Sequence, residues 1–196
     1  AQFQSGEVAY TLCNGASIWG QNLAGGEFYP KLYQEPHNYK VYGGSQYHNH
    51  TDGSQSACLI CGGLKPVNGE YQISTKDQLY WFAALVNGTD GLTKDSSAKG
   101  VLKADIQVDS GWTPIGSSGF TGSLNGQNHT VTIPAGKSLF DKIESAATVS
   151  KVSVSGGNLC NSNSGTIANC CASGTGSVKL CGSNSGTIQN CYAAGG

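Results

Sequence analysis

The segment Cys160-Asn-Ser-Asn-Ser-Gly-Thr-Ile-Ala-Asn-Cys170 returns 21 residues later as Cys181-Gly-Ser-Asn-Ser-Gly-Thr-Ile-Gln-Asn-Cys191, and this repeat decides the fold. A period this short indicates one structural unit stacked on copies of itself. The Thr-Ile and Asn-Cys pairs are separated by Gly-Ser-Asn clusters, which is typical of short strands joined by tight turns. We therefore predict an all-β fold, a right-handed parallel β-helix in which each coil covers its neighbour.

The repeat extends upstream. Ala147-Thr-Val149 aligns with Gly165-Thr-Ile167 and with Gly186-Thr-Ile188, at steps of 18 and 21 residues. Equivalent residues on adjacent coils of such a stack lie about 4.8 Å apart, so like side chains form columns. Further strands are predicted from the apolar patterns of residues 101–108, 112–116, 120–124 and 130–133.

One amphipathic helix is predicted ahead of these strands, over Ser74–Val86. Thr75 and Gln78 have the spacing of a capping box, and Asn87-Gly88 is a stop signal. Since a solenoid needs a cap that seals its first coil, we expect this helix to be the N-terminal cap. Its apolar stripe, with a spacing of i, i+3, i+4 and i+7, consists of Leu79, Phe82, Ala83 and Val86.

Composition excludes some partners. Charged residues make up 12% of the 196 residues and the net charge is -1, which argues against nucleic-acid binding. No run of about 18 apolar residues is present, so no membrane span is expected. With no visible signal peptide, we interpret the chain as a mature or excised part of a longer secreted protein. We expect its incomplete final coil to be covered by continuation of the chain or by self-association.

The sequence changes character near Lys65-Pro-Val-Asn-Gly69, and we predict two domains. Residues 65–196 form the capped β-helix. Residues 1–64 hold three of the four His residues and form a small, irregular connecting module. Within it, His48, His50, Cys58 and Cys61 are a candidate structural Zn²⁺ site, because two thiolates and two imidazoles complete a tetrahedral shell. A local Cys58–Cys61 disulfide with solvated His side chains is the alternative, and no cofactor is otherwise required.

The repeat itself stacks cysteines into two columns. Cys160 would lie over Cys181 and Cys170 over Cys191, at a Cα separation that a disulfide tolerates. Vertical disulfides would join the coils of a secreted protein, and we favour them for at least one pair. The alternative is a ladder of reduced, inward-facing thiols that fill a narrow core.

Enzymatic signals are weak. Asp105, Asp109 and Asp141 are scattered and are interpreted as turn or strand-edge residues, and the chain has no G-x-S-x-G motif. We therefore expect no enzyme, and a polysaccharide-degrading β-helix is the least favoured function. Exposed aromatic residues of the first module could stack on a glycan, although such residues more often pack a core. The candidate glycan contacts are Trp19, Tyr29 and Tyr33.

Residues 70–196 resemble a known family through an ordered series of motifs. The series includes Ile73-Ser-Thr75, Leu102-Lys-Ala-Asp-Ile106, Trp112-Thr-Pro-Ile-Gly116, Phe120-Thr-Gly122, Leu124-Asn-Gly126 and Ser185-Gly-Thr-Ile-Gln-Asn-Cys-Tyr192. It is similar to the GLUG-motif repeats of bacterial surface proteins, which include non-catalytic regions of immunoglobulin A1 proteases and gut-bacterial adhesins. The glycine-based motif that names the family is replaced here by Leu159-Cys160 and Leu180-Cys181. Residues 1–64 resemble the connecting module often found beside such repeats.

The resemblance implies a location and a role. We expect a secreted protein on the bacterial cell surface that acts as a stalk, fibre or adhesin scaffold, with head-to-tail self-assembly as an option. The alternative is an adhesion module that binds a glycan or a host surface.

Overall fold

The structure, a computed structural model, describes residues 64, 66–89 and 92–196, together with the backbone of four short strands within the first 63 residues. The chain divides into two compact units, Ala1–Lys65 and Pro66–Gly196. In the first unit, two antiparallel strand pairs are described. They are β1 (Trp19–Gly20) with β2 (Lys31–Leu32), and β3 (Asn38–Lys40) with β4 (Tyr47–Asn49).

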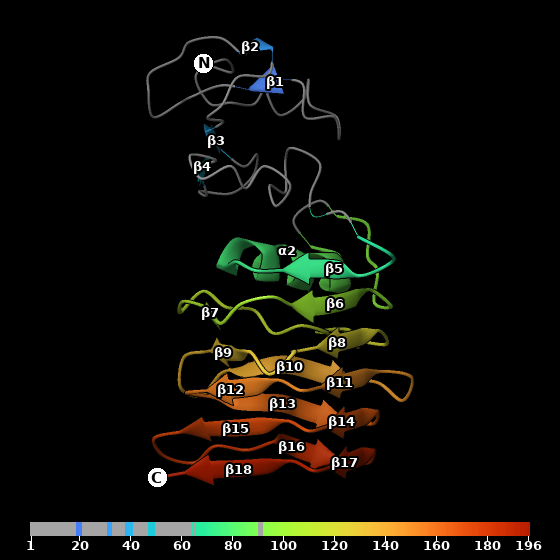
Figure 1. Ribbon diagram of the computed structural model, residues 1–196, viewed down its shortest axis with the longest axis vertical. Coiled ribbons are helices and arrows are strands. Elements are labelled where there is room, and N and C mark those ends of the chain that lie inside the picture. Colours follow the sequence, from blue (N-terminus) through green and yellow to red (C-terminus); the bar gives the residue numbers. More distant parts are fainter. Residues whose placement is uncertain are drawn as a thin grey trace. The chain divides into compact units, whose positions relative to one another are not determined.

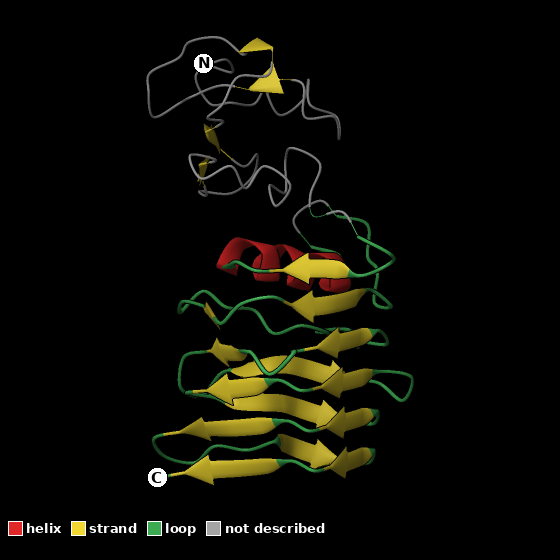
Figure 2. Cartoon of the chain, in the orientation of Figure 1, coloured by secondary structure: helices red, strands yellow, loops and turns green. Residues whose placement is uncertain are grey.

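The second unit is a parallel β-helix, as predicted, and its coils can be followed in Figures 1 and 2. Three sheets form its walls, and all strand pairs within them are parallel. The first sheet contains β5 (Tyr71–Ile73), β6 (Lys99–Leu102), β8 (Ser123–Asn125), β11 (Thr148–Ser150), β14 (Thr166–Ala168) and β17 (Thr187–Gln189). The second contains β7 (Ile106–Gln107), β9 (Thr130–Thr132), β12 (Ser153–Ser155), β15 (Cys171–Gly174) and β18 (Tyr192–Gly195). The third contains β10 (Ser138–Ile143), β13 (Asn158–Asn163) and β16 (Cys181–Asn184).

The register between coils is the one that the repeat predicts. Val149 pairs with Ile167, and Ile167 pairs with Ile188, which confirms the steps of 18 and 21 residues. These side chains alternate inward with polar neighbours that face outward, because successive residues of a strand point to opposite faces. Leu124, Val149 and Ile167 are fully buried, and each such side chain contributes about 1.5–3 kcal/mol to folding.

The predicted cap is helix α2, Lys76–Asn87. Thr75 and Gln78 form the capping box, and Gly88 ends the helix in the left-handed conformation. The predicted stripe is buried, and Phe82 meets the ring of Phe120 in the coil below. Phe120 in turn contacts Phe140, so aromatic rings join the cap to the upper coils. Figure 1 shows α2 beside β5 at one end of the stack.

The corner before each Thr-Ile strand is occupied by glycine because the coils approach closely there. A Cβ on Gly165 would lie 2.4 Å from the carbonyl oxygen of Glu144. A Cβ on Gly186 would lie 2.2 Å from the carbonyl oxygen of Gly165. Only a residue without Cβ lets neighbouring coils keep this spacing, which explains the repeated Ser-Gly-Thr.

Within the described residues, no helix has both the length and the apolar character that a membrane crossing requires.

Candidate functional site

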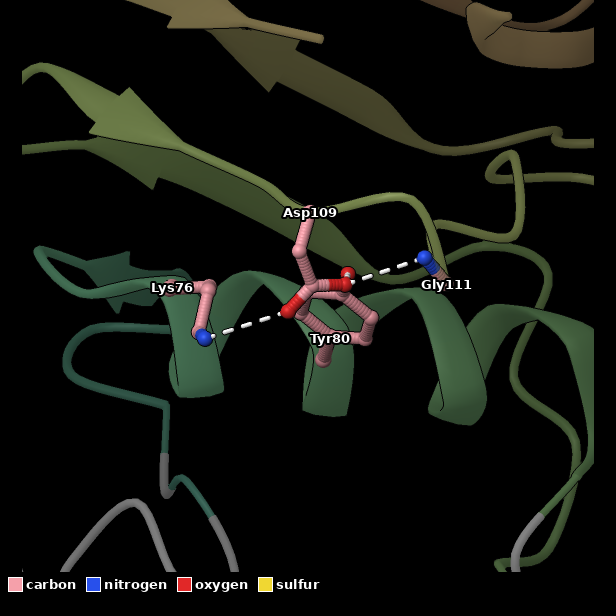
Figure 3. Close-up of polar contacts among 4 residues, drawn as sticks. All are labelled: Lys76, Tyr80, Asp109 and Gly111. Carbon is pink, nitrogen blue, oxygen red and sulfur yellow. Dashed lines mark hydrogen bonds and ion pairs between the residues drawn. The ribbon is translucent and has the colours of Figure 1, made fainter. Parts of the chain in front are cut away.

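The cap is held to the second coil by a polar cluster around Asp109 (Figure 3). Its carboxylate accepts hydrogen bonds from the Tyr80 hydroxyl and, at 3.1 Å, from the Gly111 amide. Lys76 Nζ lies 3.2 Å from the second carboxylate oxygen. Lys76 and Tyr80 lie one helical turn apart, so both reach the same acceptor from α2. We call Lys76, Tyr80, Asp109 and Gly111 the cap clasp.

The cap clasp perturbs the acidity of its members. The hydrogen bonds from Tyr80 and Lys76 lower the pKa of Asp109, because they favour its charged form. Burial raises the pKa of Tyr80 well above its ordinary value, and its hydrogen bond to Asp109 raises it further. The Tyr80 ring also meets Trp112 edge-on at 5.3 Å. The cluster therefore combines a neutral phenol and an ionised carboxylate, an arrangement that serves attachment of the cap.

A second attachment comes from Asn87, the last residue of α2. Its side-chain amide donates to the Pro114 carbonyl at 3.1 Å, and its oxygen accepts from the amides of Gly116 and Ser117, both at 2.9 Å. The predicted stop signal thus has a second role, since the same residue satisfies three backbone groups of the coil below. Sequence reasoning missed this role because the partners lie 27–30 residues away.

Side-chain bonds also link successive coils. Asp105 accepts from the Thr130 amide at 2.9 Å and lies 3.2 Å from His129 Nδ1, and these contacts lower the pKa of Asp105. Asp141 accepts from the Asn161 side chain at 2.9 Å. The three aspartates interpreted from sequence as turn or strand-edge residues therefore bind three different sets of neighbours.

The asparagines of the repeat form a column. Asn163 and Asn184 pair in register, and the Asn163 side chain donates to the Asn184 side-chain oxygen at 2.7 Å. Each also accepts from the amide of the residue two positions later, Gly165 at 3.1 Å and Gly186 at 3.3 Å. These bonds close the tight turn within a coil, and the ladder bond joins the two coils.

The cysteine columns are present, but as thiols. Cys160 pairs in register with Cys181, and the Cys170 amide lies 3.3 Å from the Cys191 sulfur. All five cysteines in the described part of the chain are free. The favoured disulfides are therefore absent, and the structure has the alternative, a ladder of reduced thiols. The reason is geometric. In-register stacking moves Cβ by the same roughly 4.8 Å as Cα, whereas disulfides have Cβ separations of about 3.5–4.5 Å.

The two buried thiols, Cys160 and Cys170, are protonated at neutral pH. Burial raises the pKa of Cys170 to about 12, and burial together with the neighbouring Cys181 also raises the pKa of Cys160. The Cys170 sulfur donates to the Ala168 carbonyl at 3.2 Å, and the Cys191 sulfur donates to the Gln189 carbonyl at 3.1 Å. Each sulfur thus satisfies the carbonyl two residues earlier in its own coil.

The other candidate residues belong to the first unit. His48 lies in β4 and Trp19 in β1, although their side chains are outside the described part. Both the Zn²⁺ prediction and the glycan prediction thus remain predictions. The remaining members, which lie outside the described residues, are Tyr29, Tyr33, His50, Cys58 and Cys61.

Comparison of the chain with protein-family models, with curated proteins and with solved structures finds no match in any of the three.

Proposed function

We propose that the β-helix is a rigid structural element of an extracellular bacterial surface protein, a stalk or adhesin scaffold. The supporting observation is the first sheet, which runs without interruption through six strands from β5 to β17. A single column of paired residues crosses it: Gln72, Val101, Asn125, Ser150, Ala168 and Gln189.

Stiffness follows from how the coils are joined. Backbone hydrogen bonds of parallel sheets connect successive coils through sheets of six, five and three strands. Side-chain bonds such as Asn163–Asn184 and Asp105–Thr130 add links between coils. The cap clasp and Asn87 join the helix to the same stack. A stack joined in this way resists bending, so its two ends keep a fixed separation, which is what a stalk requires.

Rigidity is tested by a distance measurement between the ends of the column. Non-thiol spin labels at Gln72 and Gln189 avoid the eight cysteines of the chain. Five strand spacings of about 4.8 Å predict a label-site Cα separation of about 24 Å. We expect one narrow distance distribution by pulsed electron spin resonance, and its broadening in urea is the control. A broad distribution in native buffer would contradict the proposal.

The surface location rests on the resemblance to surface-protein repeats and has its own test. An antibody raised against residues 66–196 should label intact cells that carry the gene. Labelling that requires lysis would place the protein elsewhere and remove the stalk role. Head-to-tail association belongs to the same proposal, and sedimentation that gives a monomer mass at every concentration would eliminate it.

A further inference from the structure

Cys160 and Cys181 are a register pair on neighbouring strands of the third sheet, β13 and β16. Cys160 is 1% exposed, and its sulfur lies 3.4 Å from the Leu180 carbonyl, on the coil below and directly before Cys181. The sulfur therefore sits between the two coils. The sulfurs of Cys170 and Cys191 also lie between coils, since each contacts a carbonyl of its own coil and, at 3.7 Å, a carbonyl of the neighbouring coil. Cys181 is only partly buried, which leaves a route from solvent to the pair.

The two thiols interact with each other. Burial raises the pKa of both thiols, and the neighbouring Cys181 raises that of Cys160 as well. Their strands are locked in register on both sides of the pair, by Ser162–Ser183 and Asn163–Asn184 and by the bond from the Cys160 amide to the Leu180 carbonyl. The sheet therefore fixes the spacing of the two residues along the stack.

The strand spacing is close to the sulfur separation of a metal bridge. Two sulfurs joined through a linear two-coordinate ion are about 4.6 Å apart, twice a metal–sulfur bond of about 2.3 Å. The repeat of a parallel sheet is about 4.8 Å. In the described residues no group of three or more His, Cys, Asp or Glu side chains could hold a metal ion. A cation that needs four ligands, such as Zn²⁺, therefore does not fit this end of the stack.

We propose that Cys160 and Cys181 bind one soft, two-coordinate cation of the class of Cu(I), Ag(I) and Hg(II), as a linear bridge between adjacent coils. Thiolates select such ions over hard cations. Binding breaks two S–H bonds, forms two metal–sulfur bonds and releases two protons to solvent, with no change in oxidation state. The bridge occupies the position that the sequence suggested for a disulfide and joins the same two coils.

The released protons give a signature of a two-thiol site. Below the pKa of both thiols, displacing two protons makes the apparent affinity rise about 100-fold per pH unit. Binding through a single thiol gives about tenfold per unit. Ag⁺ is the practical probe because it is stable in air, and Zn²⁺ is the control cation.

The test uses the full chain and compares two variants. Cys171 is the matched control for Cys181, since it is also partly buried but is stacked between Ser153 and Tyr192 and has no thiol neighbour in its column. In native mass spectrometry, Cys181→Ser should bind one Ag⁺ fewer than the wild type, and Cys171→Ser should bind the same number. Cysteines of the first unit contribute equally to all three proteins.

A second readout needs no substitution. Ag⁺ should protect Cys181 of the wild-type protein from N-ethylmaleimide and leave Cys171 reactive, as measured by peptide mapping, whereas Zn²⁺ should protect neither. The proposal is overturned if Cys181→Ser keeps the wild-type stoichiometry, if Cys181 stays reactive with Ag⁺ present, or if the affinity changes about tenfold per pH unit.

Discussion

Individual side chains of the repeat differ in importance although their sequence context is the same. Asn163 and Asn184 make the same turn, yet Asn163 is 1% exposed and Asn184 is exposed. Replacing Asn163 with Ala leaves the buried Gly165 amide without its acceptor, and we expect a loss of about 2 kcal/mol of folding free energy. Asn184→Ala should cost less than about 1 kcal/mol, because water can replace the lost partner.

Urea unfolding monitored by circular dichroism measures both variants on the full chain. Equal losses for the two substitutions would show that burial of the asparagine column does not matter for stability.

The stabilisation that the cap clasp contributes should depend on pH. The pKa of Asp109 is lowered in the folded state, so the unfolded chain binds more protons at low pH. The stabilisation from the cap clasp is therefore fully present above about pH 4, the ordinary aspartate range, and is lost as pH falls through the lowered folded-state pKa. We expect Asp109→Asn to be less stable than the wild type at pH 7 and equal to it at low pH.

Thermal unfolding of both proteins between pH 2 and pH 7 tests this. Tyr80→Phe is the companion variant, because it removes the hydroxyl that donates to Asp109 but keeps the ring against Trp112. The effects of Tyr80→Phe and Asp109→Asn should be non-additive at pH 7. Curves that stay parallel down to pH 2 would contradict a role for the ionised carboxylate.

Among the elements, helix α2 depends on its start signal. Thr75→Ala removes the side-chain acceptor for the Gln78 amide and should cost about 1 kcal/mol. Thr75→Ser keeps the hydroxyl and is the matched control, with stability close to that of the wild type. Chemical denaturation of both variants provides the measurement, and a neutral Thr75→Ala would mean that packing alone fixes the helix start.

The sequence was sufficient for the helix and the coils because their signals are local. Thr75 and Gln78 are three residues apart, and the spacing of Thr148, Thr166 and Thr187 sets the register directly. The partners of Asn87 and Asp109 could not be predicted, since they depend on how a helix meets a coil about 30 residues away. The cysteine prediction failed at a finer level. Cα spacing permits a disulfide, whereas the parallel Cβ directions of stacked strands do not.

The β-helix should be least protected against hydrogen exchange at its final coil. Strands β16, β17 and β18 each lie at the end of their sheet in the described part of the chain. Ala193 is exposed, whereas Val131, Val154 and Ala172, the inward residues of the same column in earlier coils, are fully buried. We expect amides of β17 and β18 to exchange with deuterium faster than those of β11 and β12, because local opening is easier where fewer neighbours must separate.

Hydrogen exchange at two protein concentrations also probes association. Protection that rises with concentration in the final coil alone would support head-to-tail contact. Uniform exchange rates along all coils would contradict the expected gradient.

The corner between β15 and β16 differs from the corners at Gly165 and Gly186, where neighbouring coils are in close contact. Residues 175–180 form a longer link there than residues 156–157 do between β12 and β13. A Cβ on Gly176 would meet nothing within 4 Å. The column from Gln72 to Gln189 lies in the first sheet and contains no residue of this corner, so we expect added length here to leave it undisturbed. An affinity tag, an epitope or a foreign recognition loop could therefore be grafted at this position and displayed sideways from the stack.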